Sequence, residues 1–177
     1  LNFFKKVLNF LLRFFTLNKN FNYVSKRNYR YIILSHLVSY DNLKYDKDFY
    51  FGNLAKKLDY NKVLFVLIDH INFNKKFIEN KIHGNYIILS KRLNFLLEVN
   101  LLLKTSIKIF YYSLFQQNIN FLSYQNILRS VDNQRISIQV KKILEKYNFR
   151  EFFFTYEGNP YEKLVCYEAQ KLKKNIR

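Results

Sequence analysis

The chain has 177 residues, of which 30 are Lys or Arg and 13 are Asp or Glu, so its formal net charge is +17. This length is typical of one domain of roughly 100–200 residues, and a hydrophobic fraction of 49% is enough for a packed core. A single cysteine, Cys166, excludes an internal disulfide framework and favours a reducing, cytoplasmic compartment. No charge-free apolar run of ~18 residues predicts a transmembrane helix.

Two interpretations of the basic charge remain open. One is an anionic partner such as nucleic acid, a phospholipid surface or a phosphorylated substrate. The other is genome composition, because Lys and other residues with A/T-rich codons are abundant, whereas Gly and Pro occur only 3 times and once. Tyrosines are interleaved with lysines and arginines over residues 21–31. In such a segment nucleic-acid bases can stack on the tyrosine rings while the cations bind phosphates. A non-enzymatic nucleic-acid-binding protein, ribosome-associated or organellar, is therefore one hypothesis.

The first 17 residues, LNFFKKVLNFLLRFFTL, predict a basic amphipathic helix with a wide apolar face. Such a helix suits an anionic membrane surface or a docking partner. The alternative is a helix that packs on the core of the domain. We expect a helix and linker over 1–20, and a domain over 21–177 that begins with polar linker residues up to 29.

Short apolar runs alternate with helical patterns along the rest of the chain. The runs predict buried strands at 31–34, 63–68, 86–89 and 152–156. A loop is expected over 36–50, and helices are expected over 52–58, 93–122 (as one or two), 135–147 and 161–174. This alternation predicts an α/β fold, a Rossmann-like domain with a mostly parallel sheet.

The turn after the last predicted strand, residues 157–162, contains the only proline of the chain. Gly158 permits a tight turn with positive φ, while Asn159 and Glu162 have the spacing of a capping box. The turn would place a helix N-terminus, which suits an anion, at the sheet edge where open α/β sheets bind ligands. Glu157 would stand there as a base or acceptor. The alternative is that Glu157 and Glu162 only shape the turn and cap the helix.

Two histidines follow predicted strands in the same way. His36 comes after the first strand, and His70 comes after the second, next to Asp69. Imidazole at a strand end is a candidate general base, although a polar strand end without a catalytic role is the alternative. The three histidines and single cysteine have no metal-ligand spacing, so no metal site is predicted.

The stretch TYEGNPYEKLVCYEAQK resembles a segment of bacterial surface-carbohydrate (O-antigen or capsule) biosynthesis proteins of the GT-B glycosyltransferase kind. In that family an E-G-x-x-[WY]-E motif closes the first Rossmann-like domain. Glu157, Gly158, Tyr161 and Glu162 match the motif. The resemblance implies transfer of a sugar from a nucleotide donor to a glycan or lipid-linked acceptor.

The same resemblance implies that a second domain holds most of the site for the nucleotide-sugar donor, so that this chain would be inactive alone. It requires no cofactor besides that substrate. We expect Glu157 and His70 to be the catalytic residues, and Gly158, Asn159, Glu162 and His36 to line the substrate site. Gly158 and Glu162 also have a structural interpretation. The expected location is cytoplasmic and peripheral at the inner membrane.

Overall fold

The computed structural model describes residues 21–25, 28–43, 48–74, 84–115, 121–172 and 175–176. The predicted basic helix over residues 1–17 lies outside the described residues, so its conformation stays a prediction.

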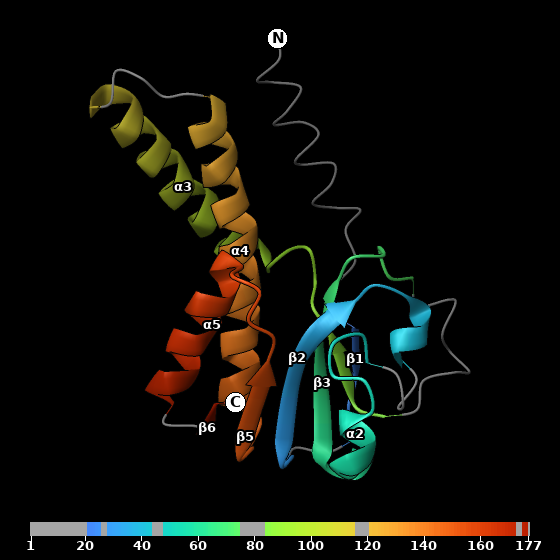
Figure 1. Cartoon of the computed structure of the whole chain (residues 1–177). Helices are drawn as coiled ribbons and strands as arrows, with labels where there is room; N and C mark the ends of the chain where they lie inside the picture. Colours follow the sequence, from blue (N-terminus) through green and yellow to red (C-terminus); the bar gives the residue numbers. More distant parts are fainter. Residues whose placement is uncertain are drawn as a thin grey trace.

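The described chain forms a mixed α/β fold around a six-stranded sheet in the order β1-β4-β3-β2-β5-β6 (Figure 1). Its strands are β1 (Phe21–Tyr23), β2 (Tyr31–Leu37), β3 (Val63–Asp69), β4 (Tyr86–Ile88), β5 (Glu151–Phe154) and β6 (Asn175–Ile176). All neighbouring strands are parallel except β1 and β4, which are antiparallel. The predicted α/β class with a mostly parallel sheet is confirmed.

The four predicted strands correspond to β2, β3, β4 and β5, whereas two short edge strands were not predicted. The linker expected up to residue 29 is wrong at β1, and the loop expected from residue 36 is wrong at the end of β2. β1 has only three residues, and its order comes from pairing with β4, with Phe21 opposite Ile88. Local sequence patterns do not encode such a long-range pairing.

The helices are α2 (Leu54–Lys57), α3 (Phe95–Phe115), α4 (Phe121–Lys146) and α5 (Pro160–Lys171). The helix expected over 135–147 begins earlier in the structure, because α4 runs unbroken for 26 residues from Phe121. Tertiary contacts stabilise its polar middle, because Arg135 pairs with the buried Glu98 of α3, and Val131 packs against Leu101. Local periodicity does not predict these contacts, because the partners lie in another part of the sequence.

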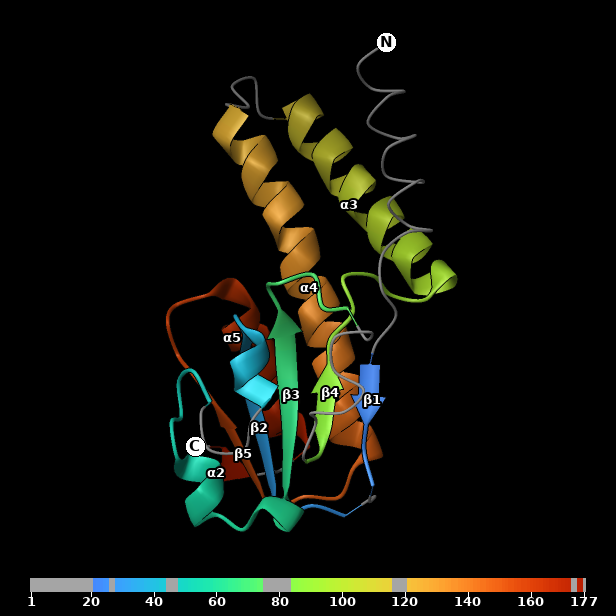
Figure 2. The ribbon, with the colours of Figure 1, turned by 90° about the vertical axis from the view of Figure 1, so that its right-hand side faces the viewer.

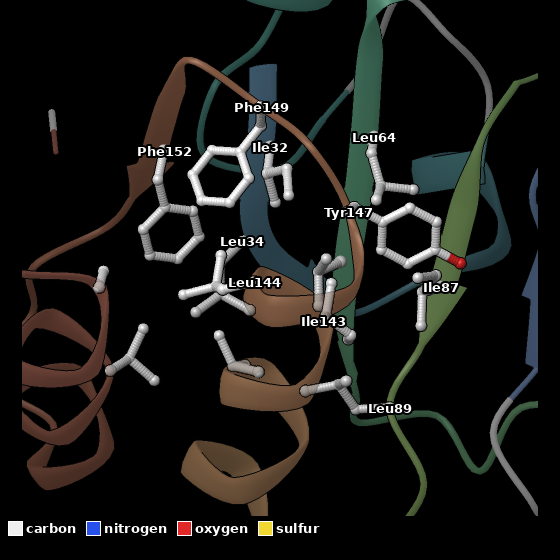
Figure 3. Packing of buried hydrophobic residues seen from close by; sticks show 14 of the residues in the cluster. Ile32, Leu34, Leu64, Ile87, Leu89, Ile143, Leu144, Tyr147, Phe149 and Phe152 are labelled. Atoms are coloured by element: carbon white, nitrogen blue, oxygen red, sulfur yellow. The ribbon is translucent and has the colours of Figure 1, made fainter. Parts of the chain in front are cut away.

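The two faces of the sheet have different covers. Helices α4 and α5 pack on one face, where Ile32, Leu64 and Phe152 are fully buried (Figure 3). The segment between β2 and β3, including α2, covers the other face over Ile33 and Leu67. Both faces of β2 and β3 are therefore buried, which explains their continuous apolar sequences.

Helices α3 and α4 project beyond the carboxyl edge of the sheet (Figure 2). No helix of the described segments is long and apolar enough to cross a membrane.

Two leucines test this account of the core by the same substitution. Leu64 is 0% exposed in β3, whereas Leu96 is 76% exposed on α3. We expect Leu64→Ala to lower the free energy of unfolding by about 2–5 kcal/mol, because the sheet cannot collapse around the lost methyl groups. Leu96→Ala should change it by less than about 0.5 kcal/mol. Urea denaturation of both variants measures the difference, and equal effects would contradict the assigned core.

Candidate functional site

A hydrogen-bonded chain of three side chains spans the carboxyl ends of neighbouring strands. His36 lies near the end of β2, His70 follows β3, and Tyr161 lies in the first turn of α5 after β5. From β2 the chain builds β3 and β4 on one side and then crosses to β5 on the other. The order of strands reverses at this point, and such a switch point is where open α/β sheets bind ligands.

The three side chains are in direct contact. His36 Nδ1 lies 2.6 Å from His70 Nε2, and His36 Nε2 lies 2.7 Å from Tyr161 Oη. The ring centroids lie 4.9 Å apart and the ring planes differ by 16°, so the two imidazoles meet edge to edge in nearly parallel planes. The backbone N–H of His70 also donates to the carbonyl oxygen of Leu37, which holds His70 beside the end of β2. We call His70, His36 and Tyr161 the relay.

The relay is buried at one end and open at the other. His36 and Tyr161 are 7% and 6% exposed, whereas His70 lies at the surface. His70 is therefore accessible from the surface, whereas His36 and Tyr161 lie behind it. This gradient is typical of a reactive group that is oriented by buried partners.

Both histidines favour the neutral form. Burial lowers the pKa of His36, and the neighbouring His70 lowers it further, whereas the carboxylates of Glu157, Glu162 and Asp48 oppose this change. Desolvation also lowers the pKa of His70, with a further contribution from Lys91, while Asp69 opposes it. Neutral imidazole has a lone pair that accepts a proton.

Tyr161 remains a phenol at neutral pH. Burial raises its pKa, and the negative charges of Glu162 and Glu157 raise it further. Its hydroxyl therefore serves as a hydrogen-bond partner of His36 Nε2 that can donate or accept, without becoming a phenolate.

The turn that carries Tyr161 is held by one buried carboxylate. Glu162 is 0% exposed and accepts hydrogen bonds from the backbone N–H groups of Glu157 and Asn159 and from the Asn159 side chain, at 2.9 to 3.1 Å. Gly158 has a φ of +84°, and Pro160 opens the helix. The capping box that the sequence predicts is thus present, and it fixes the first turn of α5.

Glu157 faces a different partner from the relay. Its carboxylate accepts a hydrogen bond from Tyr50 Oη at 3.1 Å, and the Tyr50 ring lies 5.2 Å from that of His36. Partial desolvation and the Glu157 carboxylate raise the pKa of Tyr50. Glu157 and Tyr50 therefore form a polar wall beside the relay.

Asp48 holds the backbone of the segment that carries Tyr50. Its Oδ1 accepts hydrogen bonds from Ser35 Oγ and from the backbone N–H groups of Tyr50 and Phe51, at 2.9 to 3.0 Å. Its Oδ2 is buried and has no hydrogen-bond partner in the described part of the chain. The negative charge of Asp48 acts to raise the pKa of His36.

The structure brings His36 and His70 together, but it does not place Glu157 in contact with either. Asp69 accepts hydrogen bonds from the backbone of Ile71 and Phe73, so it shapes the loop and does not orient His70. The sequence analysis missed Tyr50, Asp48 and the role of Tyr161. Of these three residues, only Tyr161 could have been recognised from the sequence, because it belongs to the E-G-x-x-[WY]-E motif. Within the described residues no group of three or more His, Cys, Asp or Glu could hold a metal ion.

Replacing the buried carboxylate tests the turn. Glu162→Gln retains the shape of the side chain but has only one acceptor oxygen. In the wild-type chain the hydrogen bonds reach both oxygens of the carboxylate. We expect the free energy of unfolding to fall by about 1–3 kcal/mol, because buried donors lose their partner. Glu145→Gln on the exposed side of α4 is the control and should be nearly neutral. Urea denaturation measures both, and an equal small effect would show that Glu162 does not hold the turn.

The lowered histidine pKa values make a further prediction about pH. The unfolded chain binds more protons than the folded chain between the ordinary histidine pKa of about 6.5 and the lower folded values. Stability should therefore fall as the pH decreases below about 6.5, with a slope of up to about 1.4 kcal/mol per pH unit for each histidine. His36→Gln removes the more buried group, so its stability should decline less steeply. Urea denaturation between about pH 7 and pH 5 measures the slopes, and equal slopes would contradict a lowered pKa of His36.

Comparisons with known proteins find little similarity. No family model matches the chain, and none of the curated proteins matches it. Two crystal structures of the C-terminal domain of a hydrogenase from Pyrococcus furiosus have TM-scores of 0.44 and 0.42 at 13% sequence identity. The alignments cover 88% of this chain and 92% and 93% of those domains. A similarity this distant does not bear on function.

Proposed function

We propose that this chain is the acceptor-side, Rossmann-like part of a glycosyltransferase-like protein that makes surface polysaccharide. It would transfer a sugar from a nucleotide donor to a glycan or lipid-linked acceptor. In this reaction an acceptor hydroxyl attacks the anomeric carbon of the donor, the bond to the nucleotide phosphate breaks, and the hydroxyl proton passes to a general base. We assign that role to His70.

The observation that carries the proposal is the relay at the switch point of the sheet. His70 combines an accessible ring with a lowered pKa and a buried orienting partner. The residues that match the family motif also build this site, because Tyr161 contacts His36 and Glu162 fixes the turn. The motif and the geometry therefore point to the same edge of the sheet.

One arrangement of tautomers allows this chemistry. If His70 Nε2–H donates to His36 Nδ1, then His36 Nε2–H donates to Tyr161 Oη, across the two short contacts of the relay. The lone pair on His70 Nδ1 is then available to accept a proton from an acceptor hydroxyl. The positive charge that follows is on His70, where the Asp69 carboxylate would stabilise it.

Glu157 remains a second candidate for the base or for binding the acceptor. Its carboxylate is exposed and stands beside the relay, but its hydrogen bond with Tyr50 engages one oxygen. We propose that Glu157 and Asn159 bind hydroxyl groups of the acceptor, while His36 orients the base and Gly158 and Glu162 maintain the turn.

The second domain with most of the donor site, and the dependence of activity on that domain, follow from the resemblance. The proposed cytoplasmic location follows also from the single cysteine, and the proposed attachment to the inner membrane follows also from the basic sequence 1–17. The basic segment 1–17 would provide that attachment, since each suitably placed Lys or Arg adds about 1 kcal/mol at an anionic surface.

Nucleic-acid binding is the weaker alternative. Two tyrosines of the proposed stacking segment, Tyr29 and Tyr31, are only 5% and 8% exposed, and they pack into the two sides of the core. They are therefore unable to stack on bases. The alternative now rests on net charge and on Tyr23, which is 50% exposed.

Kinetics of sugar transfer test the assignment of the base. In the full-length protein with its nucleotide-sugar donor, we expect His70→Gln to lower kcat by about 10²–10⁴-fold with little change in the KM of the donor. The acid limb of the pH profile should disappear with it, because the titrating base is gone. Release of the nucleotide from the donor in the presence of acceptor measures the rate.

Tyr161→Phe and Tyr156→Phe form a matched pair for the relay. Tyr161 is 6% exposed and contacts His36, whereas Tyr156 is 68% exposed nearby. Tyr161→Phe should lower kcat and shift the acid limb, and Tyr156→Phe should do neither. A His70→Gln variant that folds normally and transfers sugar at the normal rate would overturn the role of His70.

A further inference from the structure

A pocket lies on the face of the sheet that α4 covers, and it shares no residue with the relay. It has a volume of about 540 Å³ and lies between β4, the start of α3 and the last turns of α4. This volume is in the range of small-molecule sites, which is roughly 300–1,000 Å³. Asn22 of the unpredicted edge strand β1 contributes to its wall.

Cations line one part of this pocket. Arg92 comes from the segment between β4 and α3, while Lys142 and Lys146 come from α4. The two lysines are four residues apart, so they lie one above the other on the same face of the helix. Neither forms an ion pair within the described segments, and Lys146 lies 5.1 Å from the centre of the Tyr147 ring. No Asp or Glu is found among the described lining residues.

Another part of the pocket is apolar, beside the uncharged polar residues Asn22, Ser90, Asn94 and Gln139. Ile87, Leu93, Leu97 and Ile143 line it, together with the ring of Tyr147. A simple anion would use only the cationic part and would leave this surface exposed to water. The combination fits a ligand that carries negative charge at one end and an apolar or aromatic group at the other.

The pocket is also held in shape before any ligand arrives. Gln139 of α4 is 5% exposed and clamps the Ser90 backbone, accepting from its N–H and donating to its carbonyl oxygen, both at 2.9 Å. On the other side, the Leu93 N–H donates to Glu98 at 3.0 Å, and Glu98 pairs with Arg135. The segment that carries Arg92 is therefore fixed at both ends, which reduces the entropy lost on binding.

We propose that this pocket binds an organic diphosphate ester, with the diphosphate at Lys142, Lys146 and Arg92 and the organic group on the apolar surface. A diphosphate matches the number of cations, and its oxygens accept hydrogen bonds from lysine and arginine. Two sources share this chemistry, a nucleoside diphosphate and a prenyl diphosphate. The inference does not depend on the role of His70, because the two sites have no residue in common.

Isothermal titration calorimetry of the full chain with three probes tests the proposal. Uridine diphosphate carries an aromatic group, geranyl diphosphate carries an apolar chain, and inorganic pyrophosphate carries neither. We expect one of the two esters to bind at least about tenfold more tightly than pyrophosphate, because only an ester covers the apolar surface. Whichever ester binds more tightly identifies the source of the natural ligand.

Two double variants with the same change in net charge locate the site. Lys142→Gln with Lys146→Gln removes two cations from the pocket, whereas Lys56→Gln with Lys57→Gln removes two exposed cations from α2 on the other face. The first should weaken binding of the ester at least about tenfold, and the second should change it less than about twofold. Thermal unfolding of both variants checks that the fold is retained.

Three results would overturn the proposal. They are the absence of binding by either ester at millimolar concentration, equally tight binding of pyrophosphate, and equal losses in the two double variants. His70→Gln should leave binding unchanged, so a failure of the proposed reaction and a failure of this site give different results.

Discussion

The buried carboxylate of Glu162 is the constraint on which the candidate site depends. It accepts hydrogen bonds from both sides of the turn between β5 and α5, and the turn requires the positive φ of Gly158. This arrangement sets the direction of the first turn of α5 and places the Tyr161 hydroxyl against His36. A charge that is 0% exposed persists only when its oxygens are hydrogen-bonded. The family-like motif thus has a physical basis, since each of its matching residues has a definite contact or conformation.

The relay and the pocket have opposite electrostatic character in a chain of net charge +17. The relay gathers three of the 13 acidic residues around His36, whereas the described lining of the pocket has cations and no carboxylate. The two sites follow neighbouring strands, since His70 comes after β3 and Ser90 comes after β4. Lys91 lies in the sequence between Ser90 and Arg92 of the pocket lining, and its charge lowers the pKa of His70.

Local physics explains which elements the sequence could predict. The apolar runs of β2, β3 and β4 are buried on both faces, so their residues had to be apolar whatever the order of the strands. In β5 only Phe152 is fully buried, but its apolar run was still enough to predict a strand. The turn from 157 to 162 was equally predictable from the sequence. Its glycine, N-cap, proline and N3 glutamate set the conformation of residues next to them in the chain. In contrast, β1 and the unbroken α4 depend on partners far along the chain.

The sequence by itself determined the α/β class, the parallel core strands, the capped turn and the candidate histidines at strand ends. Only the tertiary structure decided that His36 and His70 belong to one site, because their contact requires β2 and β3 to be neighbours with Leu37 opposite Asp69. It also decided that Tyr161 closes the relay, since 125 residues separate it from His36. The same reason applies to the pocket, whose cations come from segments that meet only when α4 packs on the sheet. Sequence patterns report the neighbours of a residue along the chain, whereas a site is defined by its neighbours in space.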